Sequence, residues 1–379
     1  MIDLGTQRRR ARMVIAGLFP HGSTAWEIEQ SMEELGALVR ATGAAVVGSV
    51  VQKRQAPDAG LFFGKGKVEE IADRVRAAEA DAVAVDQDLT PAQVRNLEQA
   101  LGARVLDRTE VILDIFARRA KTREARLQVE LAQYEYLLPR LTRMWSHLSR
   151  TGGGIGTRGP GETQLETDRR TVRERIATLK RSLKSVEQHR HLARDRRREM
   201  YRISLVGYTN AGKSTLMNSL TKSSLPVADR LFMTLDPTTR RLHLGTGATA
   251  LLTDTVGFVD RLPHHLFAAF HSTLEEVAEA DLLLVVVDAA VPDMERRLNV
   301  VTGALEGIGA ALVDRVIVLN KIDKVEQGVD ALVARSGADA VGVSALTRTG
   351  LPRLLDLIRA KARQSAQPAG FSESATATQ

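Results

Sequence analysis

Cysteine is absent from this chain of 379 residues, and aromatic side chains make up only 4% of it. Without cysteine the chain has no disulfides, no thiolate metal ligands and no cysteine nucleophile, which fits a reducing compartment. No uninterrupted apolar stretch reaches the about 18 residues that a transmembrane helix needs, and the first residues lack the basic-then-apolar pattern of a secretory signal. We therefore expect a cytoplasmic protein without a transmembrane segment.

Basic residues are concentrated in one part of the chain. From Arg118 to Arg198 there are 21 Lys or Arg and 9 Asp or Glu, a net charge of +12, so the rest of the chain carries −5 of the total of +7. This concentration favours a polyanionic partner, with nucleic acid expected ahead of a membrane surface. A solvated, arginine-rich helix surface is the alternative. A peripheral position on a membrane stays open as a second location.

Hydrophobic periodicity divides the chain into four parts. Apolar runs alternate with amphipathic segments over residues 1–118, which predicts a small α/β domain with a largely parallel sheet. Residues 119–199 carry apolar side chains at 4-3-4-3 spacing, which predicts an antiparallel helical hairpin that Pro139 interrupts. Strand–helix alternation resumes over residues 200–365 and predicts a second, mostly parallel, doubly wound sheet. Residues 366–379 are expected to be a disordered tail. The predicted fold class is therefore α/β.

A glycine-rich loop, residues 151–163, joins the two predicted helices of the hairpin. It holds six glycines and one proline, and such a segment cannot form a regular element. Antiparallel helices usually need only about 2–8 connecting residues, so this length favours a functional tip over a plain connector. A basic-flanked tip of this kind is suited to entering a crevice that a globular surface cannot reach.

One motif indicates the chemistry of the second α/β part. Gly207-Tyr-Thr-Asn-Ala-Gly-Lys-Ser214 fits G-x-x-x-x-G-K-[ST], between a predicted strand and a predicted helix. Its glycines let backbone N–H groups converge on phosphate oxygens, and the helix N-terminus adds partial positive charge. Lys213 would reach the β- and γ-phosphates, and Ser214 would hold Mg²⁺. The candidate phosphate-binding residues are Gly207, Tyr208, Thr209, Asn210, Ala211, Gly212, Lys213, Ser214 and Thr215.

Two later motifs also follow predicted strands. In the first, Asp254 offers a carboxylate for Mg²⁺ through water, and the N–H of Gly257 can meet a γ-phosphate. In the second, Asp323 would accept two hydrogen bonds from guanine N–H groups that adenine lacks. Asn320 would brace the base and the loop, and the Lys321 stem would cover the ring. Because parallel sheets bind ligands at the carboxyl ends of their strands, these motifs predict a guanine-nucleotide site. Its further residues are Asp254, Thr255, Val256, Gly257, Asn320, Lys321, Ile322, Asp323, Ser344 and Ala345.

A candidate switch lies between these motifs. A threonine here would bind Mg²⁺ and the γ-phosphate in the triphosphate state only. Thr234, Thr238 and Thr239 compete for this role, and we favour Thr234. The candidate switch residues that would contact nucleotide are Phe232, Met233, Thr234, Leu235 and Asp236.

Phe258 stands where Ras-type enzymes carry the glutamine that orients the attacking water. A phenylalanine cannot hydrogen-bond to water, so intrinsic hydrolysis should be slow or should depend on another group, a cation or a partner. Asn210 is placed to help hold a monovalent cation, K⁺, against the phosphates. A local hydrogen bond that braces the loop is the alternative role of Asn210.

The run from Thr151 to Arg170, followed by Gly207 to Ser214, resembles the HflX family of bacterial GTPases, in the OBG–HflX-like superfamily of the TRAFAC class. The segments Phe63–Lys67, Phe232–Asp236, Asp254–Gly257 and Asn320–Asp323 match as well, and the likeness spans roughly residues 10–365. The resemblance implies a translation GTPase that lacks the catalytic glutamine. It also implies binding to the large ribosomal subunit through the N-terminal domains and splitting of stalled ribosomes under stress.

By the same resemblance, Ser214 and Thr234 would be Mg²⁺ ligands and the glycine-rich tip would approach the peptidyl-transferase region. Binding of ATP by the N-terminal domain is associated with the family, but no residue of this chain is assigned to it. Some members carry an extra C-terminal folded domain, for which this chain has only a tail. The residues expected to contact ribosomal RNA are Gly153, Gly154, Gly156, Arg158, Gly159 and Gly161.

Three other functions stay open. A tRNA-modification GTPase would share the phosphate-loop asparagine and the hydrophobic switch residue, but it would normally need a C-terminal reactive cysteine. An RNA-binding protein could use GTP only to set its conformation, with incidental hydrolysis. General DNA binding through the hairpin predicts salt-sensitive affinity for duplexes that is indifferent to nucleotide. In each case we expect a monomer.

Overall fold

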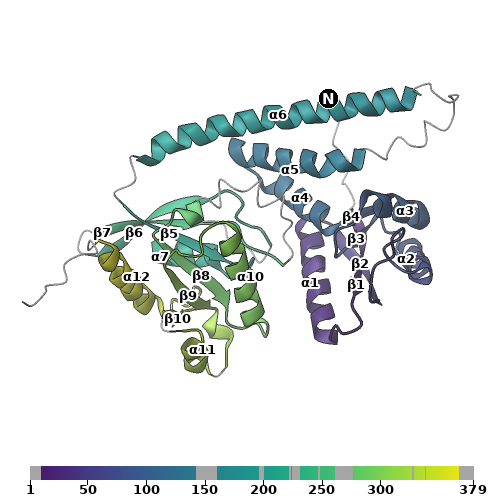
Figure 1. The fold of residues 1–379 in the computed structure, drawn as a ribbon. Helices are drawn as coiled ribbons and strands as arrows, with labels where there is room; N and C mark the ends of the chain where they lie inside the picture. The colour runs from purple at the N-terminus through teal and green to yellow at the C-terminus, as the bar shows by residue number, and fades with distance from the viewer. Residues whose placement is uncertain are drawn as a thin grey trace, which may run out of the picture. The chain divides into compact units, whose positions relative to one another are not determined.

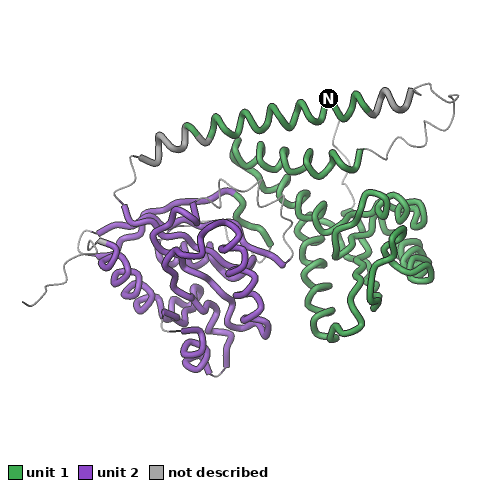
Figure 2. Tube along the Cα trace, in the orientation of Figure 1, with its two compact units in different colours: residues 1–190, 230–235, 261–270 green, residues 191–229, 236–260, 271–379 purple. Residues whose placement is uncertain are grey.

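The computed structural model describes residues 10–141, 160–195, 200–221, 223, 231–245, 248–260, 276–326, 328–337 and 339–366, and leaves out the side chains of residues 160–165, 187 and 189–195. The chain divides into two compact units (Figure 2). Unit 1 comprises residues 1–190, 230–235 and 261–270, and unit 2 comprises residues 191–229, 236–260 and 271–379. Each unit is described by itself.

Unit 1 is built on a four-stranded sheet in the order β2-β1-β3-β4, in which all neighbours run parallel. Figure 1 shows α1 on one side of this sheet and α2 and α3 on the other. Apolar side chains from β1, β3, α2 and α3 form one buried cluster; β3 is buried throughout, whereas β2 is mostly half-buried. The strands are β1 (Arg12–Phe19), β2 (Ala45–Lys53), β3 (Ala82–Val85) and β4 (Arg104–Asp107).

Three helices of unit 1, α1, α3 and α4, begin after a residue whose side chain bonds a free N–H of the first turn, whereas α2 begins after Gly64 without such a bond. Thr24 and Thr90 form capping boxes with Glu27 and Gln93, and Asp107 accepts a hydrogen bond from the N–H of Glu110. The helices are α1 (Ala25–Ala41), α2 (Lys65–Ala77), α3 (Pro91–Leu101), α4 (Arg108–Arg119), α5 (Arg123–Leu141) and α6 (Pro160–Asp195).

The helices α5 and α6 lie side by side and run antiparallel (Figure 1). Two ion pairs join them, Arg175 with Glu130 and Lys180 with Glu135. The structure differs from the predicted hairpin in the loop, because α6 already begins at Pro160, inside the segment expected to be irregular. Proline fits the first helical position, where its missing N–H has no partner to lose.

The buried face of α5 is also broader than the seam that the 4-3-4-3 spacing predicts, which runs along this helix through Leu127, Leu131, Tyr134, Leu138 and Leu141. Leu131 and Leu141 are buried, whereas Leu127 and Leu138 are only half-buried, and Tyr136, outside the seam, is buried too. The reason is that α5 packs on α4 as well as beside α6. Pro139 lies within α5, which continues to Leu141 at the end of the described stretch.

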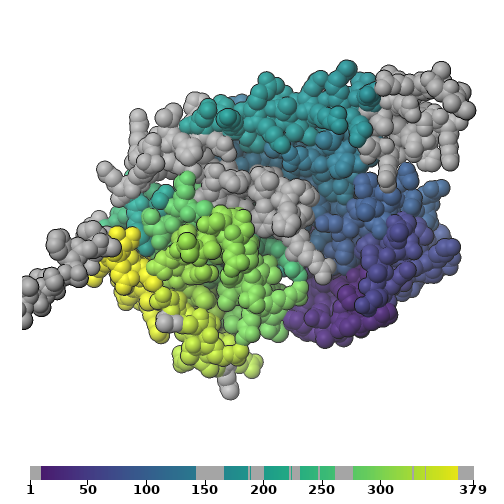
Figure 3. All heavy atoms as spheres, in the orientation of Figure 1, coloured from purple at the N-terminus to yellow at the C-terminus, as the bar shows by residue number. Residues whose placement is uncertain are grey.

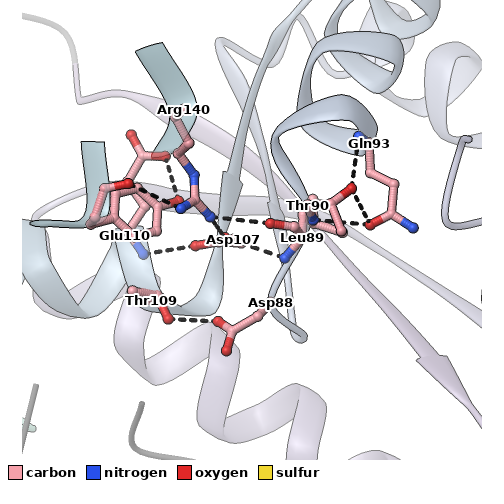
Figure 4. Close-up of polar contacts among 9 residues, drawn as sticks. Asp88, Leu89, Thr90, Gln93, Asp107, Thr109, Glu110 and Arg140 are labelled. Atoms are coloured by element: carbon pink, nitrogen blue, oxygen red, sulfur yellow. Dashed lines mark hydrogen bonds and ion pairs between the residues drawn. The ribbon is translucent and has the colours of Figure 1, made fainter. Parts of the chain in front are cut away.

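A buried ion pair holds the end of α5 to the sheet of unit 1 (Figure 4). Nη2 of Arg140 lies 2.8 Å from Oδ2 of Asp107 and 3.1 Å from the carbonyl oxygen of Leu89. The guanidinium stacks on the Tyr136 ring, 3.4 Å from its centroid. Burial raises the pKa of Asp107 and that of Glu110, although the neighbouring arginines act against the shift. No sequence motif indicates this cluster.

Unit 2 contains a six-stranded sheet in the order β10-β9-β8-β5-β7-β6. All neighbours are parallel except β6 and β7, so the prediction of an α/β fold with mostly parallel sheets is confirmed. The antiparallel edge strand β6 was not anticipated. The strands are β5 (Tyr201–Gly207), β6 (Thr238–Gly245), β7 (Ala248–Asp254), β8 (Leu282–Asp288), β9 (Arg315–Asn320) and β10 (Ala340–Gly342).

Helices flank this sheet, and one apolar cluster runs through β5, β8, β9, α7 and α12. The helices are α7 (Lys213–Thr221), α10 (Met294–Gly307), the 3-10 helix η2 (Ile322–Lys324), α11 (Val329–Arg335) and α12 (Leu351–Ala366). In neither unit is any described helix long and apolar enough to cross a bilayer.

Candidate functional site

The predicted phosphate loop joins the end of β5 to the start of α7 in unit 2. Two of its glycines are required by close approach of neighbouring groups. A Cβ on Gly207 would lie 2.1 Å from the carbonyl oxygen of Val286, and a Cβ on Gly212 would lie 2.3 Å from Nδ2 of Asn320. Since no other residue fits at these positions, the glycines shape the loop as well as exposing its N–H groups.

Lys213 is buried inside this loop. Its Nζ donates to the carbonyl oxygens of Gly207 and Tyr208, each at 3.0 Å. Burial lowers the pKa of Lys213 to about 8, and the nearby carboxylate of Asp254 acts in the opposite direction. The lysine side chain therefore lies against the loop, where its positive charge would be close to a bound phosphate.

The oxygen atoms expected to serve Mg²⁺ lie together. Oγ of Ser214 donates to Oδ2 of Asp254 at 2.6 Å, and Asp254 is fully buried at the end of β7. Over the described part of the chain, no group of three or more His, Cys, Asp or Glu side chains could hold a metal ion. A site with one hydroxyl and one carboxylate fits Mg²⁺, which usually binds through one or two carboxylates, waters and substrate phosphates.

The segment after Asp254 rests directly on the phosphate loop. The N–H of Phe258 donates to the carbonyl of Gly207 at 3.1 Å, and the N–H of Thr209 donates to the carbonyl of Phe258 at 2.7 Å. The Phe258 side chain is buried, so it presents no polar group to a water. A Cβ on Gly257 would lie 2.8 Å from Cα of Thr209, which explains a glycine there by packing as well as by its N–H.

The base-recognition residues converge from three loops of unit 2. Asn320 is buried at the end of β9, where its Nδ2 donates to the carbonyl of Ala211 at 2.8 Å and its Oδ1 accepts from the N–H of Ala345 at 3.0 Å. It therefore braces the phosphate loop and the last loop, as predicted for this position. Asp323 lies on η2 and is exposed, so a base could reach its carboxylate.

Sequence reasoning missed one partner at this end of the site. Nζ of Lys321 lies 2.7 Å from Oδ2 of Asp288, which ends β8. The signal was available, because Asp288 closes an apolar strand at the same sheet edge as the other motifs. This pair holds the lysine whose stem was expected to cover the base. Ser344 is buried and its Oγ accepts from the N–H of Thr347 at 3.1 Å.

The candidate switch residues fall on both sides of the division between the units. Residues 230–235 belong to unit 1, where the buried ring of Phe232 packs edge-to-face on Phe116 of α4, with 4.7 Å between centroids. Thr239 pairs its hydroxyl with Thr253 across β6 and β7, at 3.0 Å. The role of Thr234 as a Mg²⁺ ligand stays a prediction.

The predicted ribosome-contacting residues are almost all outside the described ranges. This applies to Gly153, Gly154, Gly156, Arg158 and Gly159. Gly161 lies in the first turn of α6.

Three family models match the chain in succession. They are described as GTP-binding GTPase N-terminal over residues 29–117, GTP-binding GTPase Middle Region over residues 119–197 and 50S ribosome-binding GTPase over residues 202–321. The GTPase HflX of Caldanaerobacter subterraneus subsp. tengcongensis is 47% identical over 94% of this chain and 82% of its own length. That of Escherichia coli (strain K12) is 46% identical over 87% of this chain and 78% of its own length.

The chain belongs to the GTPase HflX family.

Among solved structures, the complex of SsGBP with GDP has a TM-score of 0.52 and 26% sequence identity, covering 94% of this chain and all of that one. Membership of the HflX family identifies the nucleotide motifs as those of a GTP-binding GTPase, which hydrolyses GTP to GDP and phosphate. The resemblance drawn from the glycine-rich run and the phosphate loop is thereby confirmed.

Proposed function

We propose that this HflX-family GTPase binds the large ribosomal subunit and uses GTP-dependent switching to split or rescue stalled ribosomes in the cytoplasm. The observation that carries the proposal is a basic face on α6, which lies in the outer layer of unit 1 in Figure 3. Lysine and arginine side chains arrayed along a helix attract the phosphate charges of a nucleic-acid backbone. The exposed basic residues of this face are Arg170, Arg173, Arg181 and Lys184, whereas Arg175 and Lys180 pair with glutamates of α5.

Two further observations support a ribosomal partner. The family model matched over residues 202–321 is described as a 50S ribosome-binding GTPase. The buried Phe258 side chain offers nothing that could orient water, which supports a slow intrinsic rate that a partner increases.

In the proposed cycle, GTP orders the switch around Thr234, and engagement of the hairpin with ribosomal RNA completes the hydrolytic site. Mg²⁺ held by Ser214 and Thr234, with Asp254 acting through water, would neutralise charge on the β- and γ-phosphates. Asn210, which is exposed and has φ of +63°, would help to hold K⁺ beside the same phosphates. Release of phosphate then lowers the affinity for the subunit.

The test is GTP turnover with and without purified large ribosomal subunits, in K⁺ and then in Na⁺. We expect the subunits to raise turnover at least about 10-fold. The double variant Arg170→Gln/Arg173→Gln should need a higher subunit concentration for half-maximal stimulation, while turnover of the free protein stays unchanged. The matched control is Arg335→Gln/Arg353→Gln, which removes two exposed arginines from unit 2.

Each outcome has one meaning. Turnover that does not respond to subunits contradicts the proposal and favours a nucleotide-switched RNA-binding protein with incidental hydrolysis. Subunit affinity that is the same with GTP and GDP contradicts the switching part. Faster turnover in K⁺ than in Na⁺, with the difference lost in Asn210→Ala, would support a K⁺ site at Asn210. Equal rates in K⁺ and Na⁺ would exclude that site.

A further inference from the structure

The phosphate loop contains a buried hydroxyl that no described group satisfies. Thr209 is 3% exposed, and within the described residues its Oγ1 has no hydrogen-bond partner. A buried hydroxyl that lacks a partner is costly and rare in native proteins. Such a group in a ligand site calls for an explanation from the chemistry of that site.

The backbone of Thr209 cannot supply that explanation. Its N–H is already committed to the carbonyl oxygen of Phe258 at 2.7 Å. This N–H is therefore not free for a phosphate oxygen. The hydroxyl of Thr209 is therefore the group that could still bond to a ligand or a water.

The surroundings of Thr209 place it at the γ-phosphate end of the loop. A Cβ on Gly257 would lie 2.8 Å from Cγ2 of Thr209 and 2.9 Å from Nζ of Lys213. Gly257 and Lys213 are the two groups that meet the γ-phosphate in a site of this kind. The side chain of Thr209 thus lies against Gly257, close to Nζ of Lys213, and its backbone is bonded to Phe258, whose buried ring cannot bond to water.

We propose that the hydroxyl of Thr209 is a catalytic group that accepts a hydrogen bond from the attacking water. The water oxygen forms the new bond to the γ-phosphorus, and the bond from that phosphorus to the β–γ bridging oxygen breaks with its electron pair left on GDP. The proton of the water ends on the released phosphate, so Thr209 orients the water without any net transfer of a proton. This supplies part of what a glutamine at position 258 would do.

The experiment compares Thr209→Val, which keeps the shape, with Thr209→Ser, which keeps the hydroxyl. Turnover is measured on the full chain alone, without ribosomal subunits, so the result does not depend on the ribosome proposal. In single-turnover assays with excess protein, Thr209→Val should lower the rate about 10- to 100-fold, and Thr209→Ser should restore it to within about 3-fold of wild type. The Kd values of GTP and GDP should change by less than about 3-fold, because the bond forms to water rather than to nucleotide.

Two further readouts separate catalysis from structure. Trapping of GDP with aluminium fluoride, which mimics the in-line transition state, should weaken in Thr209→Val while binding of GDP alone is kept. The unfolding midpoint of the nucleotide-free valine variant should be no lower than that of wild type, since a methyl group replaces a hydroxyl without a partner. The matched control is Thr302→Val on α10, where the hydroxyl already bonds the carbonyl of Leu298 at 3.0 Å. This control should leave turnover unchanged.

The proposal is overturned by any of three results. The first is a wild-type rate in Thr209→Val, and the second is a slow rate that serine does not restore. The third is a Kd for GTP that rises as much as the rate falls, because the hydroxyl would then bind the γ-phosphate in the ground state.

Discussion

Removing the positive charge of Arg140 should destabilise unit 1 by an amount that shrinks as the pH falls. Arg140→Met leaves the stem over the Tyr136 ring but leaves Asp107, which is fully buried, without its cation. Breaking a buried ion pair by removing one partner typically costs about 3–5 kcal/mol. Asp107 can limit that cost by taking up a proton, and this limit depends on pH.

The limit follows from the ordinary pKa of the carboxyl group. With an unperturbed value of 3.8, protonation of Asp107 costs about 4.4 kcal/mol at pH 7, from 1.36 kcal/mol per unit over 3.2 units. At pH 5 the same product is only about 1.6 kcal/mol, over 1.2 units. We therefore expect a loss of about 3 kcal/mol in the free energy of unfolding at pH 7, and no more than about 1.6 kcal/mol at pH 5.

The sign agrees with linkage. Burial raises the pKa of Asp107, so its contribution to stability is fully present below pH 3.8 and is lost as the pH rises through the folded-state value. Arg140 opposes this shift in the wild type, and its removal raises the pKa further. The decline of stability with rising pH should consequently extend to higher pH in the variant.

Urea unfolding followed by tryptophan fluorescence measures this effect in the right part of the chain. Both tryptophans, Trp26 and Trp145, lie within the first 190 residues, which belong to unit 1. The matched control is Arg175→Met, which breaks the exposed pair with Glu130 and should change stability by less than about 0.5 kcal/mol at either pH. Arg140→Lys, which keeps the charge but loses the planar fork, should fall between the two.

Two outcomes would refute this reasoning. A loss below about 1 kcal/mol at pH 7 would mean that the pair contributes no more than a surface pair does. An equal loss at pH 5 and pH 7 would mean that Arg140 acts through packing or through its bond to the Leu89 carbonyl, and not through the charge of Asp107.

Two further predictions concern the nucleotide site. Gly257→Ala should lower GTP turnover at least about 10-fold while the affinity for GDP is nearly kept, because its Cβ would lie 2.8 Å from Cα of Thr209. Wild-type turnover would show that the segment of Gly257 and the phosphate loop separate before hydrolysis. Asn320→Asp should weaken the binding of both GTP and GDP at least about 10-fold, as measured by titration calorimetry. The reason is that a buried side chain loses its hydrogen-bond donor to the Ala211 carbonyl and gains a charge. Unchanged affinity would show that the two hydrogen bonds of Asn320 do not hold the loops in place.

Much of the nucleotide site is predictable because each of its motifs is local. A strand, a tight turn and a helix start are encoded within a dozen residues, as they are from Ile203 to Thr215. Parallel strands then bring their carboxyl ends to one edge without further information from the sequence. This is why Asn320 could be assigned a bracing role before its partners, Ala211 and Ala345, were known.

The features that sequence reasoning missed depend on contacts between distant segments. Arg140 and Asp107 are 33 positions apart and belong to no motif, so only the packing of α5 on α4 brings them together. The hydroxyl of Thr209, which has no partner among the described residues, is a similar case, because a pattern can place a threonine in the loop but cannot show which of its polar groups is already bonded.

Phe232 shows how a motif and packing can assign one residue to different tasks. Its position in the sequence, between the phosphate loop and Asp254, predicts that it is part of a nucleotide switch. In the structure its ring is 2% exposed and packs on Phe116 within unit 1. Its backbone has φ of +54°, which is unfavourable for a bulky side chain and costs roughly 1–3 kcal/mol. Burial of an aromatic ring of this size, together with an edge-to-face contact, contributes enough to offset that cost. The buried ring therefore holds the segment around Phe232 on α4 within unit 1, and the part of Phe232 in a nucleotide switch stays a prediction.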